Sequence, residues 1–140
     1  MPRKSLKELL GSVSLFEGLS KPELTKIEKL GKEVEFPKGK TIVTEGETGV
    51  GFHLILEGKT KVVVGGRKRS TMGPGDWFGE LSLIDRGPRT ATVETETPVR
   101  TFSLLSWEFL PLLDKNPKIT RKIMVEMCRR LRAERLDHSH

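Results

Sequence analysis

Long apolar runs and paired cysteines are both missing from this chain of 140 residues. Without a run of about 18 apolar residues, the sequence predicts no membrane-spanning helix. Cys128 is the only cysteine, which excludes an internal disulfide and favours a reducing compartment. The opening residues, MPRKSLKELLGS, have neither the hydrophobic region nor the cleavage site of a signal peptide. We therefore expect a cytoplasmic protein that does not act at a membrane.

Charge of one sign is only in moderate excess, with 25 lysines and arginines against 19 acidic residues. The basic residues are scattered, apart from clusters at Arg67–Arg69 and Arg129–Arg135. The first is typical of a hairpin tip and the second of a solvated helix face. A surface of this kind favours an anionic ligand or partner. The charge alone does not predict that this chain binds DNA.

Two capping boxes predict helices near the N-terminus, within residues 5–30. In each box a serine is followed three residues later by a glutamate, at Ser5 and Ser20. Apolar residues at helical spacing follow both boxes. These residues are Leu6, Leu9, Leu10 and Val13 after the first box, and Leu24, Ile27 and Leu30 after the second.

The residue pattern changes over residues 31–105, where short β-branched and aromatic runs alternate with glycine-rich turns. About eight strands at this spacing predict a small antiparallel sandwich or barrel. The pair Gly65–Gly66 predicts a two-residue hairpin. The fold class is thus mainly β with flanking helices: an antiparallel β-roll or jelly-roll barrel.

Helical pattern returns over residues 106–137. Asn116 and Pro117 pair a capping residue with proline at the first helical position. An apolar stripe follows, which either covers the roll or forms a homodimer interface. Its members are Ile119, Ile123, Met124, Met127 and Leu131. The whole chain is interpreted as a single domain over residues 1–140.

Histidine is scarce, and this bears on the main enzymatic alternative. A cupin-type jelly-roll enzyme holds its metal with several histidines and a glutamate from neighbouring strands. Only His53 lies among the predicted strands, whereas His138 and His140 lie in the tail. No Ser/His or Cys/His set for nucleophilic catalysis is visible. We therefore expect a binding protein with no metal or other cofactor, not an enzyme.

The stretch FGELSLIDRGPRTATV, from Phe78 to Val93, contains the most informative pair of charges. Gly79 precedes a short predicted helical turn, whose free amides favour a phosphate. The Arg89 guanidinium matches two phosphate oxygens, and the Glu80 carboxylate accepts from a hydroxyl. Together they suit a ribose phosphate. The alternative is a modest surface ion pair between Glu80 and Arg89.

This stretch resembles the phosphate-binding cassette of the cyclic nucleotide-binding domain, as found in cyclic-nucleotide-dependent kinases, gated channels and catabolite-activator-type regulators. The resemblance extends over residues 13–135. GLSKPELTKIEKL is similar to the entry helix, and FPKGKTIVTEGETGVGFHLILEGKTKVVV to the first half of the roll. PVRTFSLLSWEFLPLLDKNP is similar to the last strands and the following helix.

The resemblance implies a role for each matching residue. Arg89 would hold the cyclic phosphate and Glu80 the ribose 2′-hydroxyl. Backbone amides, together with the Ser82 hydroxyl, would add to the phosphate site at Gly79, Leu81 and Ser82. Thr90 would reach the phosphate or the purine. The resemblance also implies an apolar wall around the base and a C-terminal helix that covers it. The wall residues are Val62, Met72 and Phe78, and the lid residues are Met127, Arg130 and Leu131.

The ligand implied is a cyclic purine mononucleotide, with cAMP preferred. Binding of cGMP is also possible, since Thr90 permits both bases. The resemblance implies a regulatory sensor that answers by moving its C-terminal helix. The chain has no helix-turn-helix module after that helix, so we expect no direct DNA binding by it. Three alternatives stay open: a stand-alone sensor, a fragment of a larger transcription factor or channel, and an interaction domain with a vestigial pocket and an unknown effector protein.

Overall fold

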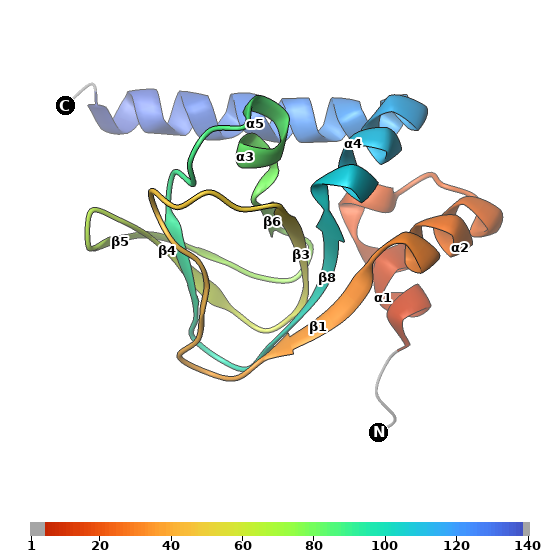
Figure 1. The fold of residues 1–140 in the computed structure, drawn as a ribbon, viewed down its shortest axis with the longest axis horizontal. Coiled ribbons are helices and arrows are strands. Elements are labelled where there is room, and N and C mark those ends of the chain that lie inside the picture. Colours follow the sequence, from red (N-terminus) through yellow and green to blue (C-terminus); the bar gives the residue numbers. More distant parts are fainter. Residues whose placement is uncertain (1–4, 139–140) are drawn as a thin grey trace.

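The computed structural model describes residues 5–138, with no account of the side chains of residues 134–138. A block of strands lies between helices at either end (Figure 1). The helices are α1 (Leu6–Ser12), the 3-10 turn η1 (Ser14–Phe16), α2 (Lys21–Leu30), α3 (Glu80–Asp85), α4 (Ser106–Lys115) and α5 (Pro117–His138). The strands are β1 (Lys32–Phe36), β2 (Thr41–Val43), β3 (Gly51–Glu57), β4 (Thr60–Val64), β5 (Arg67–Met72), β6 (Trp77–Phe78), β7 (Thr92–Thr95) and β8 (Val99–Leu105).

The strands form two antiparallel sheets of four, in the orders β1-β8-β3-β6 and β2-β7-β4-β5. The predicted antiparallel roll is confirmed. Within the described residues the sheets remain separate, so the barrel form of the prediction is wrong. The tip of β4–β5 is the predicted hairpin, because Gly65 and Gly66 both adopt positive φ, at 59° and 78°.

The capping serines begin α1 and α2 as expected. At Ser20 both halves of the capping box form, with Glu23 bonding back to the Ser20 amide. At Ser5 the hydroxyl accepts from the Glu8 amide but donates to the Glu8 carboxylate, so only half of the box is present.

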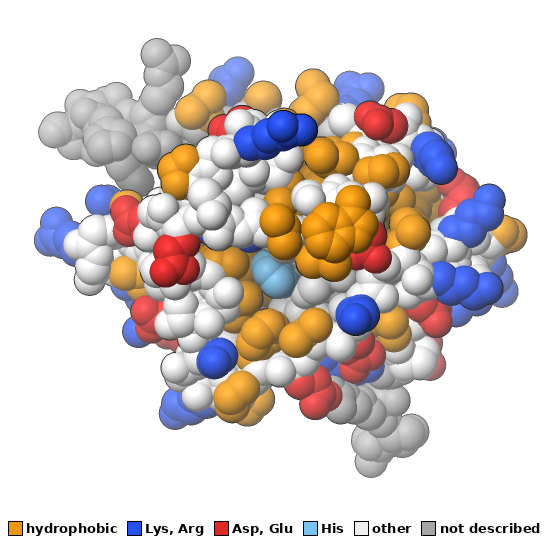
Figure 2. Space-filling model, viewed as in Figure 1, with side chains coloured by type: hydrophobic (Ala, Val, Ile, Leu, Met, Phe, Trp, Pro, Cys, Tyr) orange, Lys and Arg blue, Asp and Glu red, His pale blue; other side chains and the backbone are white. Residues whose placement is uncertain are grey.

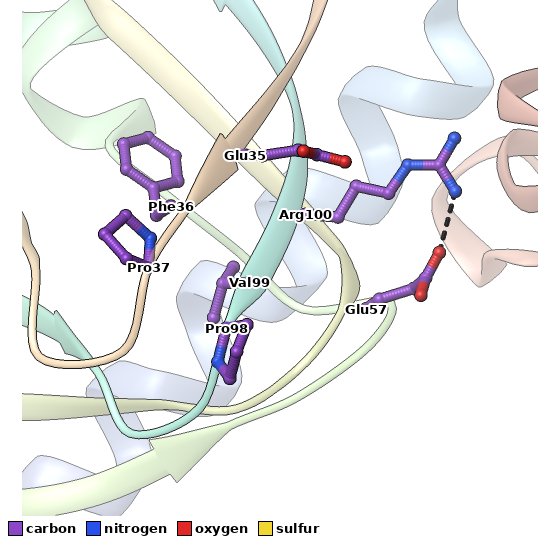
Figure 3. Close-up of a pocket in the computed structure, with 7 residues that line it drawn as sticks. All are labelled: Glu35, Phe36, Pro37, Glu57, Pro98, Val99 and Arg100. Carbon is purple, nitrogen blue, oxygen red and sulfur yellow. Dashed lines mark hydrogen bonds and ion pairs between the residues drawn. The ribbon is translucent and has the colours of Figure 1, made fainter.

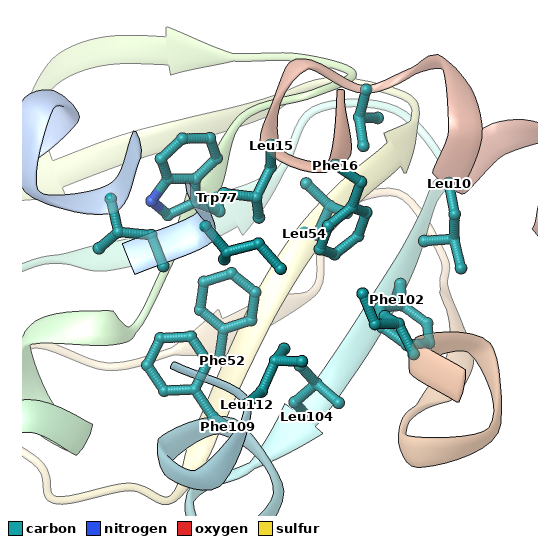
Figure 4. Close-up of a cluster of buried hydrophobic side chains, with 14 of the residues drawn as sticks. Leu10, Leu15, Phe16, Phe52, Leu54, Trp77, Phe102, Leu104, Phe109 and Leu112 are labelled. Carbon is teal, nitrogen blue, oxygen red and sulfur yellow. The ribbon is translucent and has the colours of Figure 1, made fainter. Parts of the chain in front are cut away.

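Two apolar clusters lie on opposite faces of the β1-β8-β3-β6 sheet. The larger fills the space between this sheet and the helices, and Phe52 stacks on Phe109 within it at 4.5 Å (Figure 4). The smaller cluster lies inside the roll and comprises Ile55, Phe78, Val93 and Val99. Neighbouring residues of β3 point alternately into the two clusters, as expected for a strand with both faces covered.

The apolar stripe of α5 divides between the core and solvent. Ile119 and Ile123 are buried in the larger cluster, and Met127 packs against its edge. Met124 and Leu131 are 58% and 62% exposed. Part of the stripe therefore covers the roll, and the rest is open. In Figure 1, α5 runs along one side of the roll next to α3.

Candidate functional site

Gly79 joins β6 to α3 in a conformation that other residues avoid. Its φ is 96°, and a Cβ built there would lie 2.5 Å from the Gly51 carbonyl oxygen and 2.7 Å from Arg89 Nη1. Glycine is therefore required both by the backbone angle and by the closeness of Arg89. The predicted helical turn follows directly as α3, with Glu80 as its first residue.

Arg89 lies inside the loop region that faces α3, and its side chain is buried. Nη1 donates to the Gly79 carbonyl and Nη2 to the Gly51 carbonyl, each at 2.9 Å. Burial lowers the pKa of Arg89, while the nearby Glu80 charge opposes that shift. A guanidinium carries five donors, so the two bonds leave donors available for an anion.

Two glycines that the sequence analysis did not single out make room for this arginine. A Cβ at Gly49 would lie 2.5 Å from Arg89 Nη2, and Gly51 supplies the carbonyl that accepts from it. The backbone of the same loop holds Arg89 from both sides, through Glu47 and Gly46 at 2.8 Å. The signal was present in the sequence, as the glycine-rich segment GETGVG.

Glu80 is 1% exposed and is bonded to α5, not to Arg89. Arg130 Nη1 donates to Glu80 at 2.7 Å, and its Nη2 donates to the Trp77 carbonyl at 2.5 Å. Burial raises the pKa of Glu80, and the Arg130 charge works against this. The alternative of a surface ion pair between Glu80 and Arg89 is therefore wrong. Instead, the carboxylate ties α3 to the C-terminal helix.

The remaining predicted residues lie around these two groups with different exposure. Phe78 belongs to the cluster inside the roll, Met72 packs against it, and Val62 pairs with Val93 of that cluster. Ser82 is buried, whereas Leu81 and Thr90 are exposed. Of the predicted lid residues, Arg130 reaches the site, Met127 packs on the core, and Leu131 is exposed to solvent.

His53 is a further polar group here, which the sequence analysis weighed only as a metal ligand. Its ring stacks on Phe78 at 5.1 Å, and Nδ1 lies 2.8 Å from Ser103 Oγ. Burial, assisted by the charge of Arg89, lowers the pKa of His53 to about 4. The face drawn in Figure 2 is hollowed near its centre, where histidine atoms are visible between hydrophobic side chains.

A separate pocket of about 440 Å³ lies at the far end of the β1-β8-β3 sheet (Figure 3). Arg100 is its only lining cation, and it bonds to Glu57 at 2.7 Å and also to Glu33. These hydrogen bonds raise the pKa of Arg100. With Glu35 also present, the acidic lining does not suit an anionic ligand. The chemistry that suits a phosphate is at Arg89.

Neither a metal cluster nor a membrane span is found in the part of the chain that is described. No group of three or more histidine, cysteine or acidic side chains there could hold a metal ion. No helix within residues 5–138 is both long and apolar enough to cross a membrane.

The fold and the site together define a β-roll domain in which a short helix lies next to a buried arginine, an arrangement that suits a small anionic ligand. The chain matches the cyclic nucleotide-binding domain family over residues 33–116, which is more than half of its length. It belongs to the cyclic nucleotide-binding domain family.

Known relatives include transcription regulators and kinase regulatory subunits. The CRP-like cAMP-activated global transcriptional regulator of Mycobacterium tuberculosis is 34% identical over 91% of this chain and 59% of its own length. The structure of the Thermus thermophilus catabolite activator protein gives a TM-score of 0.78 at 29% identity, covering 89% of this chain and 61% of that one. The regulatory subunit of a cAMP-independent protein kinase A from Trypanosoma brucei gives a TM-score of 0.77 at 26% identity, covering 85% of this chain and 43% of that one. The chain thus spans about three fifths of the curated relative.

Proposed function

We propose that this chain binds a cyclic purine mononucleotide, cAMP in preference to cGMP, and acts as a regulatory module. The observation that carries the proposal is the buried guanidinium of Arg89 in its glycine-lined loop, facing the start of α3. A buried cation beside free amides is a strong site for a phosphate, because charge-assisted hydrogen bonds gain strength when water is excluded.

In this proposal each part of the ligand meets one predicted group. The free donors of Arg89 hold the exocyclic oxygens of the cyclic phosphate. The amides of Gly79, Leu81 and Ser82 add neutral donors, and Ser82 contributes its hydroxyl. Glu80 accepts from the ribose 2′-hydroxyl. Since a carboxylate has about four lone-pair positions, Glu80 can hold the hydroxyl and Arg130 together.

The shared carboxylate supplies a mechanism for signalling. Arg130 on α5 and the ligand hydroxyl both depend on Glu80, so a ligand that fixes Glu80 also favours the docked position of α5. A ligand shifts a conformational equilibrium only by its differential affinity for the two states. The docked helix is the state that cyclic nucleotide favours, and Met127 and Leu131 of that helix are the residues proposed to cover the base.

The roll recognises the base through its apolar interior and Thr90. Phe78, Met72 and Val62 form the apolar wall. The exposed Thr90 hydroxyl, just after Arg89, is available to the purine. A hydroxyl here can meet the guanine amino group, so cGMP remains a second ligand.

The module binds its ligand without catalysing a reaction, in keeping with the regulators among its relatives. We place it in the cytoplasm, without a membrane role and without a metal or other cofactor. The whole protein transmits the ligand signal through a homodimer or through an effector protein. We propose no direct DNA binding by these residues.

A second candidate is an interaction domain whose pocket no longer takes cyclic nucleotide. Two observations favour it. The Arg89 side chain is already bonded to two backbone carbonyls, and a neighbouring structure is the regulatory subunit of a protein kinase A that is named as cAMP-independent.

A thermal-unfolding screen with cAMP, cGMP, linear 5′-AMP and no addition separates the two candidates. A ligand present at 100 times its Kd stabilises the folded protein by about 2.7 kcal/mol. We expect both cyclic nucleotides to raise the Tm and 5′-AMP to leave it unchanged. No rise at millimolar cyclic nucleotide would favour the second candidate.

A further inference from the structure

His53 lies on the inner face of β3, beside the proposed phosphate site. Side chains alternate along a strand, so His53 points into the roll together with Ile55, while Phe52 and Leu54 point into the other cluster. Its partner across the sheet is Phe78 of β6, the residue before Gly79. His53 is therefore placed next to the start of α3 by backbone pairing as well as by its ring stack.

The hydrogen bonds around His53 favour one position for the proton on its ring. Each hydroxyl has one proton to donate. Thr101 Oγ1 lies 3.5 Å from the Val34 carbonyl and 3.0 Å from Ser103 Oγ, which in turn lies 2.8 Å from His53 Nδ1. These contacts favour a chain in which Nδ1 donates to Ser103, Ser103 to Thr101 and Thr101 to the carbonyl. In that chain neutral His53 has its lone pair on Nε2.

Nε2 lies close to the part of the loop that holds Arg89. A Cβ on Gly51 would be 2.9 Å from Nε2, and the carbonyl of the same Gly51 accepts from Arg89 Nη2. No described residue forms a hydrogen bond with Nε2. The ring thus presents an unused lone pair beside a buried cation, in the place where the ligand's anion is proposed to bind.

The charged surroundings of His53 are few. Arg89 is the group whose charge acts on its pKa. On α3, which also packs against β3, Glu80 is held by Arg130 and Asp85 is exposed and bonded to the Gly87 amide. On β8, Thr101 and Ser103 are neutral, and the Arg100 guanidinium is bonded to glutamates. On α4, Glu108 accepts from the Leu105 amide.

Resting on the function proposed above, we propose that His53 contacts the bound anion through Nε2 and takes up a proton when the ligand binds, so that affinity rises as the pH falls. A lone pair facing a phosphate oxygen is repulsive, whereas a protonated Nε2 donates to it. In the free protein burial, and after it the charge of Arg89, opposes that proton. The incoming anion offsets the charge of Arg89 and attracts the proton directly.

The direction of the pH dependence follows from linkage. Without ligand, the pKa of His53 is lowered to about 4, so the ring is neutral throughout the physiological range. A nearby anion raises this pKa, and protons are taken up between the two values. If the complex restores the ordinary value of about 6.5, affinity rises about tenfold from pH 8 to pH 5.5. Below about pH 4 no further gain is expected.

The test is calorimetric titration of the whole chain with cAMP at pH 6, in two buffers that differ in ionisation enthalpy. The difference in heat counts the protons taken up. The parent protein should take up about 0.7 proton if the complex reaches the ordinary pKa of histidine, and both His53→Gln and His53→Phe should take up less. His53→Phe keeps an aromatic ring against Phe78, so it guards against loss of packing. Lys29→Gln on the exposed face of α2 removes a cation elsewhere and should match the parent.

Glu80 also has a raised pKa, and because the ribose hydroxyl donates to its ionised form, its part of the proton exchange is a release. That part remains in both His53 variants, and the difference between parent and variants belongs to His53. In parallel, the His53 ring signals in NMR should titrate at a higher pH with cAMP than without it. Equal proton uptake by parent and variants, or an unchanged His53 titration, would overturn the inference alone. Absence of cAMP and cGMP binding by the parent would overturn the proposed function and this inference with it.

Discussion

Arg130 on the C-terminal helix and Glu80 at the start of α3 form a 2.7 Å ion pair, although fifty positions separate them in the chain. The carboxylate is 2% exposed and the guanidinium side chain 34% exposed. The pair therefore closes the site from the α5 side. It brings the residue expected to hold the ribose into direct contact with the helix expected to move.

Loss of Arg130 should destabilise the domain in a pH-dependent way. Burial already raises the pKa of Glu80, and Arg130→Gln removes the charge that opposes this rise. The folded state then holds the Glu80 proton at a higher pH than the unfolded chain, so stability is greater at low pH and falls as the pH rises through that pKa. In urea unfolding we expect a loss of about 1.5–3 kcal/mol at pH 7.5 and a smaller loss at pH 5.

Arg129→Gln is the matched control for that experiment. Arg129 is on the solvent side of α5 and pairs only with Glu126 among the described residues. An exposed pair of this kind contributes less than about 1 kcal/mol. Equal losses of unfolding free energy for the two variants at both pH values would show that the contact with Glu80 stabilises the domain no more than an exposed ion pair does.

Glu80 should bind the ribose 2′-hydroxyl of the ligand. The parent should bind cAMP more tightly than its 2′-deoxy analogue, because only the former donates to the buried carboxylate. A hydrogen bond to a charged group is worth about 1.5–3 kcal/mol, which is roughly tenfold to a hundredfold in Kd. In Glu80→Gln the preference should shrink. Glu94→Gln, at a half-exposed pair on β7, serves as the control. Calorimetry with both nucleotides measures the effect, and an unchanged preference in Glu80→Gln would assign the hydroxyl to another group.

Gly49 should be required for binding because of the space that it leaves for Arg89. In Gly49→Ala the methyl group would lie 2.5 Å from Nη2, so the guanidinium must move. We expect at least a tenfold loss of cyclic nucleotide affinity, since a displacement of this size breaks a charge-assisted contact. Gly73→Ala meets no atom within 4 Å and should bind like the parent. Similar Kd values for the two alanine variants would contradict the assigned position of Arg89.

Thr90 should matter more for guanine than for adenine. Thr90→Ala removes the exposed hydroxyl next to Arg89, and it should weaken the binding of cGMP several-fold more than the binding of cAMP. Competition between the two nucleotides in one titration measures the ratio directly. A ratio that stays the same would remove Thr90 from base recognition.

Much of the fold was predictable because local chemistry and tertiary structure agree. The Ser20 capping box, the Gly65–Gly66 hairpin and Pro117 at the start of α5 all lie where their residue types indicate. The arrangement of the strands into two sheets was not predictable from the pattern. A sandwich and a barrel share the same alternation of inward and outward residues.

Several residues predicted for the site lie close together, but their contacts were not predicted. Arg89, Glu80 and Gly79 come together as expected, yet the partner of Glu80 proved to be Arg130 on α5. Sequence spacing could not place a long-range ion pair, because α5 had no motif to fix its rotation. The same limit explains why Leu131, an expected lid residue, lies exposed while Ile123 is buried. His53 was considered only as a metal ligand, because its neighbours across the sheet, Phe78 and Ser103, could not be identified from the sequence.

The most direct test of the central claim is calorimetric titration of the parent and of Arg89→Ala with cAMP, with Tm values measured in the absence of ligand to show that both are folded. The account predicts a loss of roughly 2–5 kcal/mol in binding, because the variant leaves a desolvated phosphate without its cation. A folded Arg89→Ala protein that binds cAMP as tightly as the parent would contradict it.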